Sequence, residues 1–198
     1  RRGLRGHAVD AVEELIGACR GALTEAQPTL AVREIVARAV AEPARLQRAL
    51  GPISEGGLHV LHGSAELSVL HVVWAPRMHL PPHDHRMWAV IGIHGGAEDN
   101  HFFRRRGAGI EAAGGRELRE GDVFVLGADG VHSVTNPLTT SFTGAIHVYG
   151  GDFVHAARSE WDDETLEERD WDYARAQRLF TEANRAWERE RLQSGPSS

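Results

Sequence analysis

The chain has 198 residues, a formal net charge of −6 and one cysteine, and this length can bury the full core of one domain. An acidic balance gives no electrostatic basis for a nucleic-acid partner or for binding an anionic membrane. A single cysteine excludes an internal disulfide, and no apolar run is long enough to cross a bilayer. No signal peptide is visible, so we expect a cytoplasmic protein. The oligomeric state is left open.

Three helices are predicted in the N-terminal part. Apolar side chains recur at helical spacing over residues 7–24 and again over residues 30–40. Glu42-Pro43 suits the start of a third helix and Leu50-Gly51 suits its end, because proline is tolerated at the first helical position and glycine ends helices. Cys19 lies on the first apolar stripe, so we expect a buried, unreactive thiol.

From Leu58 the hydrophobic period changes to that of short strands separated by turn residues. The predicted strands cover residues 58–61, 65–74, 88–93, 100–104, 123–126, 131–135 and 141–149. Gly-Gly, Asn-Pro and the Ala113-Gly114-Gly115 stretch are interpreted as turns between them. Many short strands with closely spaced turns favour a sandwich or a barrel. We therefore divide the chain into a helical segment over residues 1–51 and a β domain over residues 52–159.

The remaining residues, 160–198, begin with an acidic run that we interpret as a solvated face without chemistry. Tyr173–Leu192 carries a modest apolar stripe, which predicts a C-terminal helix. Ser194–Ser198 is expected to fray.

A pair of histidines in Pro82-His83-Asp84-His85 opens a stretch that ends at Gly95-Gly96. We interpret this stretch as a strand, in which alternate side chains share a face. His83 and His85 then point the same way and could reach one metal ion, whereas Asp84 points away and has a structural role.

This stretch and residues 121–136 resemble the two motifs of the cupin superfamily. The first motif carries H-x-H; in the second, Gly121 is followed eleven residues later by His132 and four residues after that by Asn136. The resemblance implies an all-β fold, the cupin double-stranded β-helix or jelly roll, with the helices appended. The glutamate that usually follows H-x-H is missing, so it implies a metal site of His83, His85 and His132 without a carboxylate. Glu98 is expected to be exposed.

The alternative for these side chains is a surface or hydrogen-bonded histidine, since the chain has twelve. The H-x-H pair together with a third histidine at the cupin spacing favours metal binding. Imidazole suits zinc, copper, iron and nickel alike, and three histidines leave positions open for substrate and dioxygen.

His147 and Tyr149 lie on the predicted strand 141–149, where odd positions are polar or small and even positions are mostly apolar. If the apolar positions pack under the helices, His147 and Tyr149 face the barrel cavity together. A buried Tyr–His hydrogen bond with a structural role is the alternative. Beside an open metal position, the phenol could donate a proton or hold an oxygen atom.

The H-D-H-x-x-W pattern over residues 83–88, with His132 and Ile146-His147-Val148-Tyr149-Gly150-Gly151, resembles the thiol dioxygenases. In this cupin family an Fe(II) ion on three histidines converts a thiol to a sulfinate with O2. The resemblance covers residues 58–162 and is nearer to the bacterial 3-mercaptopropionate branch than to cysteine dioxygenase. It implies Fe(II) on His83, His85 and His132, a small thiol and O2 as partners, and His147 and Tyr149 as an outer pair.

Two departures from that family concern the outer pair, and the position of an arginine bears on the substrate. Ala145 stands where the family has the serine of its Ser-His-Tyr relay, and no cysteine is near enough to crosslink the tyrosine. The arginine that binds the substrate carboxylate in the mercaptopropionate branch lies nine residues after the tyrosine, which is Arg158 here. A salt bridge from Arg158 to Glu160 or Asp162 is the alternative. Arg86 is a second candidate for substrate binding, at the cavity mouth.

Two other functions fit the same motifs, because a fold does not determine an activity. A cupin metal site could catalyse C–C cleavage by a dioxygenase or a metal-assisted isomerisation. The chain could also be a ligand-binding cupin without turnover.

Overall fold

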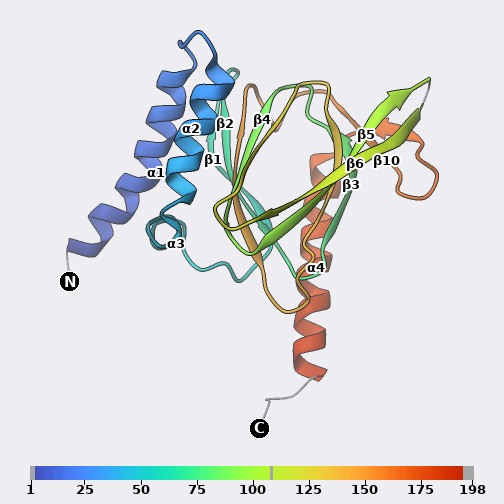
Figure 1. Cartoon of the computed structure of the whole chain (residues 1–198). Coiled ribbons are helices and arrows are strands. Elements are labelled where there is room, and N and C mark those ends of the chain that lie inside the picture. Colours follow the sequence, from blue (N-terminus) through green and yellow to red (C-terminus); the bar gives the residue numbers. More distant parts are fainter. Residues whose placement is uncertain (1–2, 108, 194–198) are drawn as a thin grey trace.

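Two antiparallel β-sheets face each other in the computed structural model, which describes residues 3–107 and 109–193 (Figure 1). The first sheet has, in spatial order, β1 (Gly57–Gly63), β2 (Ser68–Trp74), β9 (Thr143–Tyr149), β4 (Ala89–Gly95) and β7 (Val123–Leu126). The second sheet has, in spatial order, β11 (Glu168–Asp170), β10 (Ser159–Trp161), β3 (His79–Asp84), β8 (Val131–Thr135), β5 (Ala97–Arg106) and β6 (Gly109–Arg119). This is the predicted cupin double-stranded β-helix.

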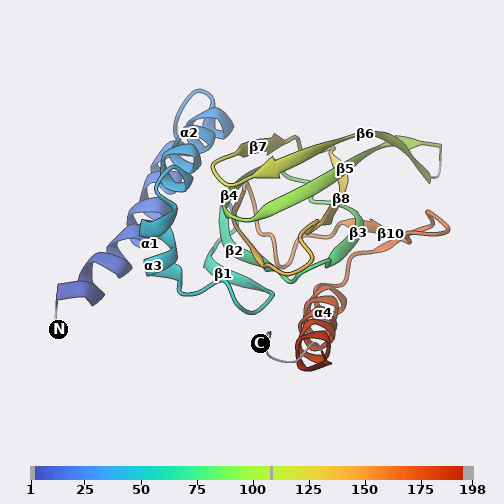
Figure 2. The same cartoon turned by 60° about the horizontal axis from the view of Figure 1, so that its bottom comes forward.

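Three helices cover the outer face of the first sheet, as Figures 1 and 2 show: α1 (Gly3–Ala22), α2 (Pro28–Val40) and α3 (Pro43–Leu50). They confirm the predicted N-terminal helices, and their buried side chains form one core with Val69, Val90 and Ile146 of the sheet. Helix α2 comes so close to β4 that a Cβ atom at Gly92 would lie 2.4 Å from Cγ1 of Val36. Within the described residues, no helix is both long and apolar enough to span a bilayer.

Helix α4 (Tyr173–Gln193) packs elsewhere, away from the three N-terminal helices (Figure 2). Phe180 stacks on the indole of Trp74 with ring centres 5.2 Å apart. Asn184 accepts a hydrogen bond from the backbone N–H of Gly56 and donates one to its carbonyl, at 2.7 and 2.8 Å. The C-terminal helix is thus tied to the strand that begins the barrel. The expected fraying of residues 194–198 lies outside the described residues.

The sequence missed three strands of the second sheet. Ala113-Gly114-Gly115 was interpreted as a turn, but these residues lie inside β6, where Gly114 adopts φ +133° beside a register shift against β5. Part of the acidic run forms β10 and β11, but most of the run, β11 included, is exposed as predicted. Glu160 on β10 is 5% exposed and pairs with Arg169 and Arg175. Short or glycine-rich strands show little hydrophobic alternation, so the sequence pattern does not identify them.

Candidate metal centre

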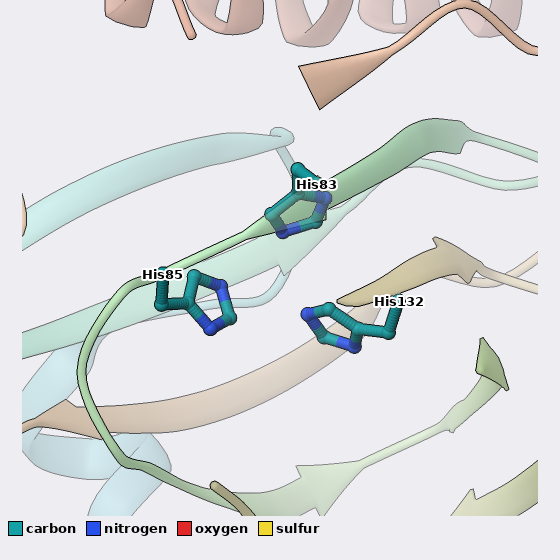
Figure 3. A group of neighbouring side chains, drawn as sticks. All are labelled: His83, His85 and His132. Atoms are coloured by element: carbon teal, nitrogen blue, oxygen red, sulfur yellow. The ribbon is translucent and has the colours of Figure 1, made fainter. Parts of the chain in front are cut away.

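His83, His85 and His132 converge between the two sheets, as Figure 3 shows. One potential ligand atom from each lies within 4.8 Å of the other two. His83 and His132 are directly opposite each other in the β3–β8 pair, which places their side chains on the same face of the sheet. The predicted strand through residues 81–96 is interrupted: β3 ends at Asp84, and Arg86 turns the chain with φ +57°. His85 therefore reaches the cluster from just beyond the strand end.

The three imidazoles are buried, with 4%, 1% and 1% of their surfaces exposed, and two of them have a nitrogen atom without a protein partner. Nδ1 of His83 donates to the carbonyl of Pro81 at 2.9 Å, which leaves Nε2 as the acceptor. Nε2 of His132 and Nδ1 of His85 have no hydrogen-bond partner in the described chain. Buried polar atoms without partners are rare and destabilising, and a bound metal ion would satisfy them.

Burial determines the protonation of the cluster. It lowers the pKa of His83 to about 4 and the pKa of His85 and of His132 well below the ordinary histidine value. All three rings are therefore neutral at neutral pH. A neutral imidazole has a free lone pair, which is the form that binds a metal ion. The residues present thus fit a metal ion of the kind that imidazole prefers.

A buried carboxylate supports the cluster from behind. Glu98 was expected to be exposed, but it is fully buried and accepts hydrogen bonds from Trp74 Nε1 and Asn100 Nδ2, each at 2.9 Å. Asn100 in turn accepts a hydrogen bond from Nδ1 of His132 at 2.7 Å. This chain holds the His132 ring with Nε2 toward the cluster, as outer partners of metal-binding histidines commonly do. Strand alternation could have placed Glu98 and Asn100 on one face, but not inside the barrel.

Tyr149 and His147 line the same cavity as the three histidines, as the alternation along β9 predicts. The Tyr149 hydroxyl lies 2.9 Å from Nδ1 of His147, and its ring centre lies 4.9 Å from that of His85. Burial raises the pKa of Tyr149, so the phenol keeps its proton at neutral pH. A protonated hydroxyl with a fixed orientation therefore lies beside the three-histidine cluster.

Arg158 is a second unusual polar group, and it lies behind two rings of the cavity wall without lining the cavity itself. Only 4% of it is exposed, yet none of its three guanidinium nitrogens has a hydrogen-bond partner in the described chain. It lies 4.0 Å over the ring of Phe153 and 4.4 Å over the ring of Trp171, both of which line the cavity. Burial lowers its pKa to about 10, so it is still a cation at neutral pH.

Among the described residues, Arg158 forms no salt bridge to Glu160 or Asp162, so this alternative is not found. Arg169 pairs with both carboxylates, at 2.6 Å and 3.7 Å respectively. The backbone around Arg158 is held instead by Asp84, whose Oδ1 accepts the N–H of Ser159 at 2.7 Å. Asp84, on the strand that also carries His83, thus positions the arginine.

The other carboxylate oxygen of Asp84 binds the side chain of Arg86. It accepts a hydrogen bond from Arg86 Nε at 2.7 Å and another from the guanidinium of Arg105. Asp84 is fully buried and faces away from the histidines, as predicted. Arg86 is half-exposed and does not line the cavity. Its guanidinium is therefore engaged in the ion pair that anchors the end of β3.

The cavity itself is small. Its volume of about 10 Å³ has room for roughly one water molecule or one metal ion. Apolar and aromatic side chains form most of its wall beyond the polar groups already described: Leu58, Val72, Trp74, Leu80, Val134, Phe153 and Trp171. A ligand larger than a water molecule therefore needs side chains at the mouth to move.

No family model matches the sequence. Solved structures similar to this chain include a cupin protein from Methanocaldococcus jannaschii, with 12% identity and a TM-score of 0.41 over 50% of this chain and 83% of that one. A double-stranded β-helix protein from Klebsiella pneumoniae has 14% identity and a TM-score of 0.43 over 56% and 82%. Oxalate oxidase in complex with glycolate has 16% identity and a TM-score of 0.41, over 51% of this chain and 55% of that one. These likenesses concern the fold alone. By its own strand order and side chains, the chain has the double-stranded β-helix fold of the cupin type, with a buried three-histidine cluster that could hold a metal ion.

Proposed function

We propose that this chain is an Fe(II)-dependent dioxygenase that oxidises a small carboxylate-bearing thiol to a sulfinate. The observation that carries the proposal is one cavity in which three neutral imidazoles meet a protonated phenol. A guanidinium without a hydrogen-bond partner is stacked on two rings of the cavity wall. The reaction adds both atoms of O2 to sulfur, RSH + O2 → RSO2H, so it needs no further reductant.

His83, His85 and His132 would hold the iron. Because the three ligands are neutral and none is a carboxylate, the ion would keep its full positive charge, which favours an anionic sulfur ligand. Three ligands also leave coordination positions open for that sulfur and for dioxygen. Bound iron would lower the pKa of the thiol so that it loses its proton, and it would provide the redox chemistry with dioxygen. The protein supplies rigidity, because two of the three ligands lie on paired strands and His132 is held by Asn100.

Tyr149 would act on the oxygen side of the reaction. Its hydroxyl is held by His147 and keeps its proton, so it can donate a hydrogen bond to an oxygen atom beside the metal cluster. The apolar wall around it excludes bulk water, which strengthens such a bond.

Arg158 would bind the substrate carboxylate. A buried cation without a hydrogen-bonded partner is costly, and an anionic ligand would satisfy it. The planar guanidinium matches a carboxylate with two parallel donors, and it already stacks on two rings of the cavity wall. The narrow cavity favours a thiol with only a few atoms between sulfur and the carboxylate.

The decisive experiment is oxygen uptake by protein loaded with Fe(II) under anaerobic conditions. The panel contains small thiols with a carboxylate at different distances from sulfur, each matched by a neutral thiol of similar size. We expect uptake with the carboxylate series, and with ¹⁸O2 we expect two labelled oxygens in the sulfinate by mass spectrometry.

Two other outcomes would reject the proposal. Iron bound stoichiometrically without oxygen uptake on any thiol would favour C–C cleavage or isomerisation at the same site. Failure to bind iron or any other metal would favour a ligand-binding cupin without turnover.

A further inference from the structure

A second group of histidines lies on the opposite, helix-covered face of the first sheet. His59 is on β1, His71 is its direct cross-strand partner on β2, and His94 is on β4. The ring centres of His71 and His94 are 5.1 Å apart, and those of His59 and His71 are 5.8 Å apart. In the three-histidine cluster of the candidate metal centre, the ring centres of the three pairs are 4.7, 5.0 and 5.1 Å apart.

We propose that His71 and His94, completed by His59, bind a second divalent transition-metal ion of the class that imidazole prefers, such as Zn²⁺. Two imidazoles on one tetrahedral ion, with Zn–N distances of about 2.0–2.1 Å, place their ring centres roughly 5 Å apart. The His71–His94 separation already has this value. His59 is exposed at the groove surface with its ring over Gly57, so it would have to turn toward the pair to become the third ligand.

The nitrogen atoms of the buried pair are without partners. Nε2 of His71 and both ring nitrogens of His94 have no hydrogen bond to another described residue, although the two side chains are 5% and 0% exposed. Burial also lowers the pKa of His71 to about 3 and that of His94 to about 4, so both rings are neutral. Their lone pairs are therefore available to a metal ion.

The surrounding backbone makes room for the ring of His94. A Cβ atom at Gly144 on the neighbouring strand β9 would lie 2.7 Å from Cε1 of His94, so a side chain at that position would displace the ring. On the other side, Gln47 of α3 donates a hydrogen bond to the His94 carbonyl at 3.1 Å. The ring is thus held between the sheet and the helices.

An open groove leads to this second site. It has a volume of about 530 Å³ and runs between helices α1 and α3 and strands β1 and β2, with His59 and His71 in its wall. Glu13 and Glu55 line the same groove and offer carboxylate oxygens near the entry. The inference does not depend on the proposed dioxygenase activity, because this groove shares no lining residue with the metal-centre cavity.

The test is the number of Zn²⁺ ions bound per chain, measured by calorimetric titration of metal-free protein and by metal analysis after gel filtration. We expect two ions in the wild type. His71→Phe keeps a ring but removes the ligand, and it should bind one ion. His83→Ala/His132→Ala should also bind one, and all three changes together should bind none. His101→Ala, an exposed histidine on β5, is the matched control and should bind two.

One wild-type ion that is lost in His83→Ala/His132→Ala, or two ions in His71→Phe, would overturn the proposal. If His71→Phe does not fold by circular dichroism, the His83→Ala/His132→Ala protein still decides the matter with Co²⁺. A tetrahedral Co²⁺ absorption band without thiolate charge transfer is expected in that protein. Its absence would show that the second histidine group binds no metal.

Discussion

Oε2 of Glu98 lies 3.7 Å from Nε2 of His147, and both groups are buried. The opposite nitrogen of His147 lies 2.9 Å from the Tyr149 hydroxyl, so carboxylate, imidazole and phenol form a row. Ala145, where the thiol dioxygenases have a serine, packs against Ile91, Ile93 and Leu118 instead. No hydrogen bond joins Glu98 to His147 at this distance, so Glu98 can act on His147 only through its charge.

Glu98→Gln removes the charge but keeps the shape and one acceptor oxygen. We expect a clear loss of turnover, toward the lower end of the about 10²–10⁴-fold typical of acid–base groups, because the carboxylate acts through His147. Iron content should stay near that of the wild type. Glu117→Gln, an exposed glutamate on β6, is the control. Equal kcat values for the two variants would limit Glu98 to a structural role.

Tyr149→Phe removes one hydroxyl from the cavity wall without changing the ring. If the hydroxyl acts on oxygen, kcat should fall by about 10²–10⁴-fold while iron content and KM change little. Iron analysis and steady-state oxygen uptake measure the two effects separately. Turnover at the wild-type rate would mean that Tyr149 and His147 only complete a buried hydrogen bond.

His132→Ala tests the ligand set. Two remaining histidines bind a metal ion weakly, so we expect most of the iron to be lost after gel filtration. The melting temperature of metal-free protein should change little, because the barrel is held by its apolar cores rather than by a metal. Undiminished iron in this variant would exclude the three-histidine site.

Arg158→Met keeps much of the apolar stem that packs on Phe153 but removes the cation. Loss of a charge-assisted hydrogen bond costs roughly 1.5–3 kcal/mol, so KM for carboxylate thiols should rise by about ten- to a hundredfold. KM for matched neutral thiols should stay the same. Equal losses for both series, measured by oxygen uptake, would assign Arg158 to the fold.

Cys19 provides a pH-dependent test of the helical core. It is fully buried, and burial raises the pKa of its thiol to about 12, against about 8.5 for a free cysteine. The protonated thiol's contribution to stability is complete below pH 8.5 and is lost as the pH rises toward 12. At pH 8 we expect Ellman's reagent to detect no thiol in the native protein and one after denaturation. Rapid reaction of the native protein would contradict the packing of α1.

The sequence by itself determined those features that depend on local spacing. Helical and strand periods identify the three N-terminal helices and most of the barrel strands, and alternation alone places His147 with Tyr149. The predicted proximity of His83 and His85 is also found, although His85 lies just beyond the end of β3. These relationships hold because each side chain's direction follows from its own backbone, whichever neighbours the chain later acquires.

Only the tertiary structure decided which groups meet across strands. The burial of Glu98, the unpaired state of Arg158 and the closeness of His71 to His94 depend on strand order and register. Strands β10 and β11, three residues each, show no pattern of their own, yet the pairing of β10 with β3 brings Arg158 near the rings of Phe153 and Trp171. Such contacts join residues far apart in the chain, and the free energy of the whole fold selects them rather than any local preference.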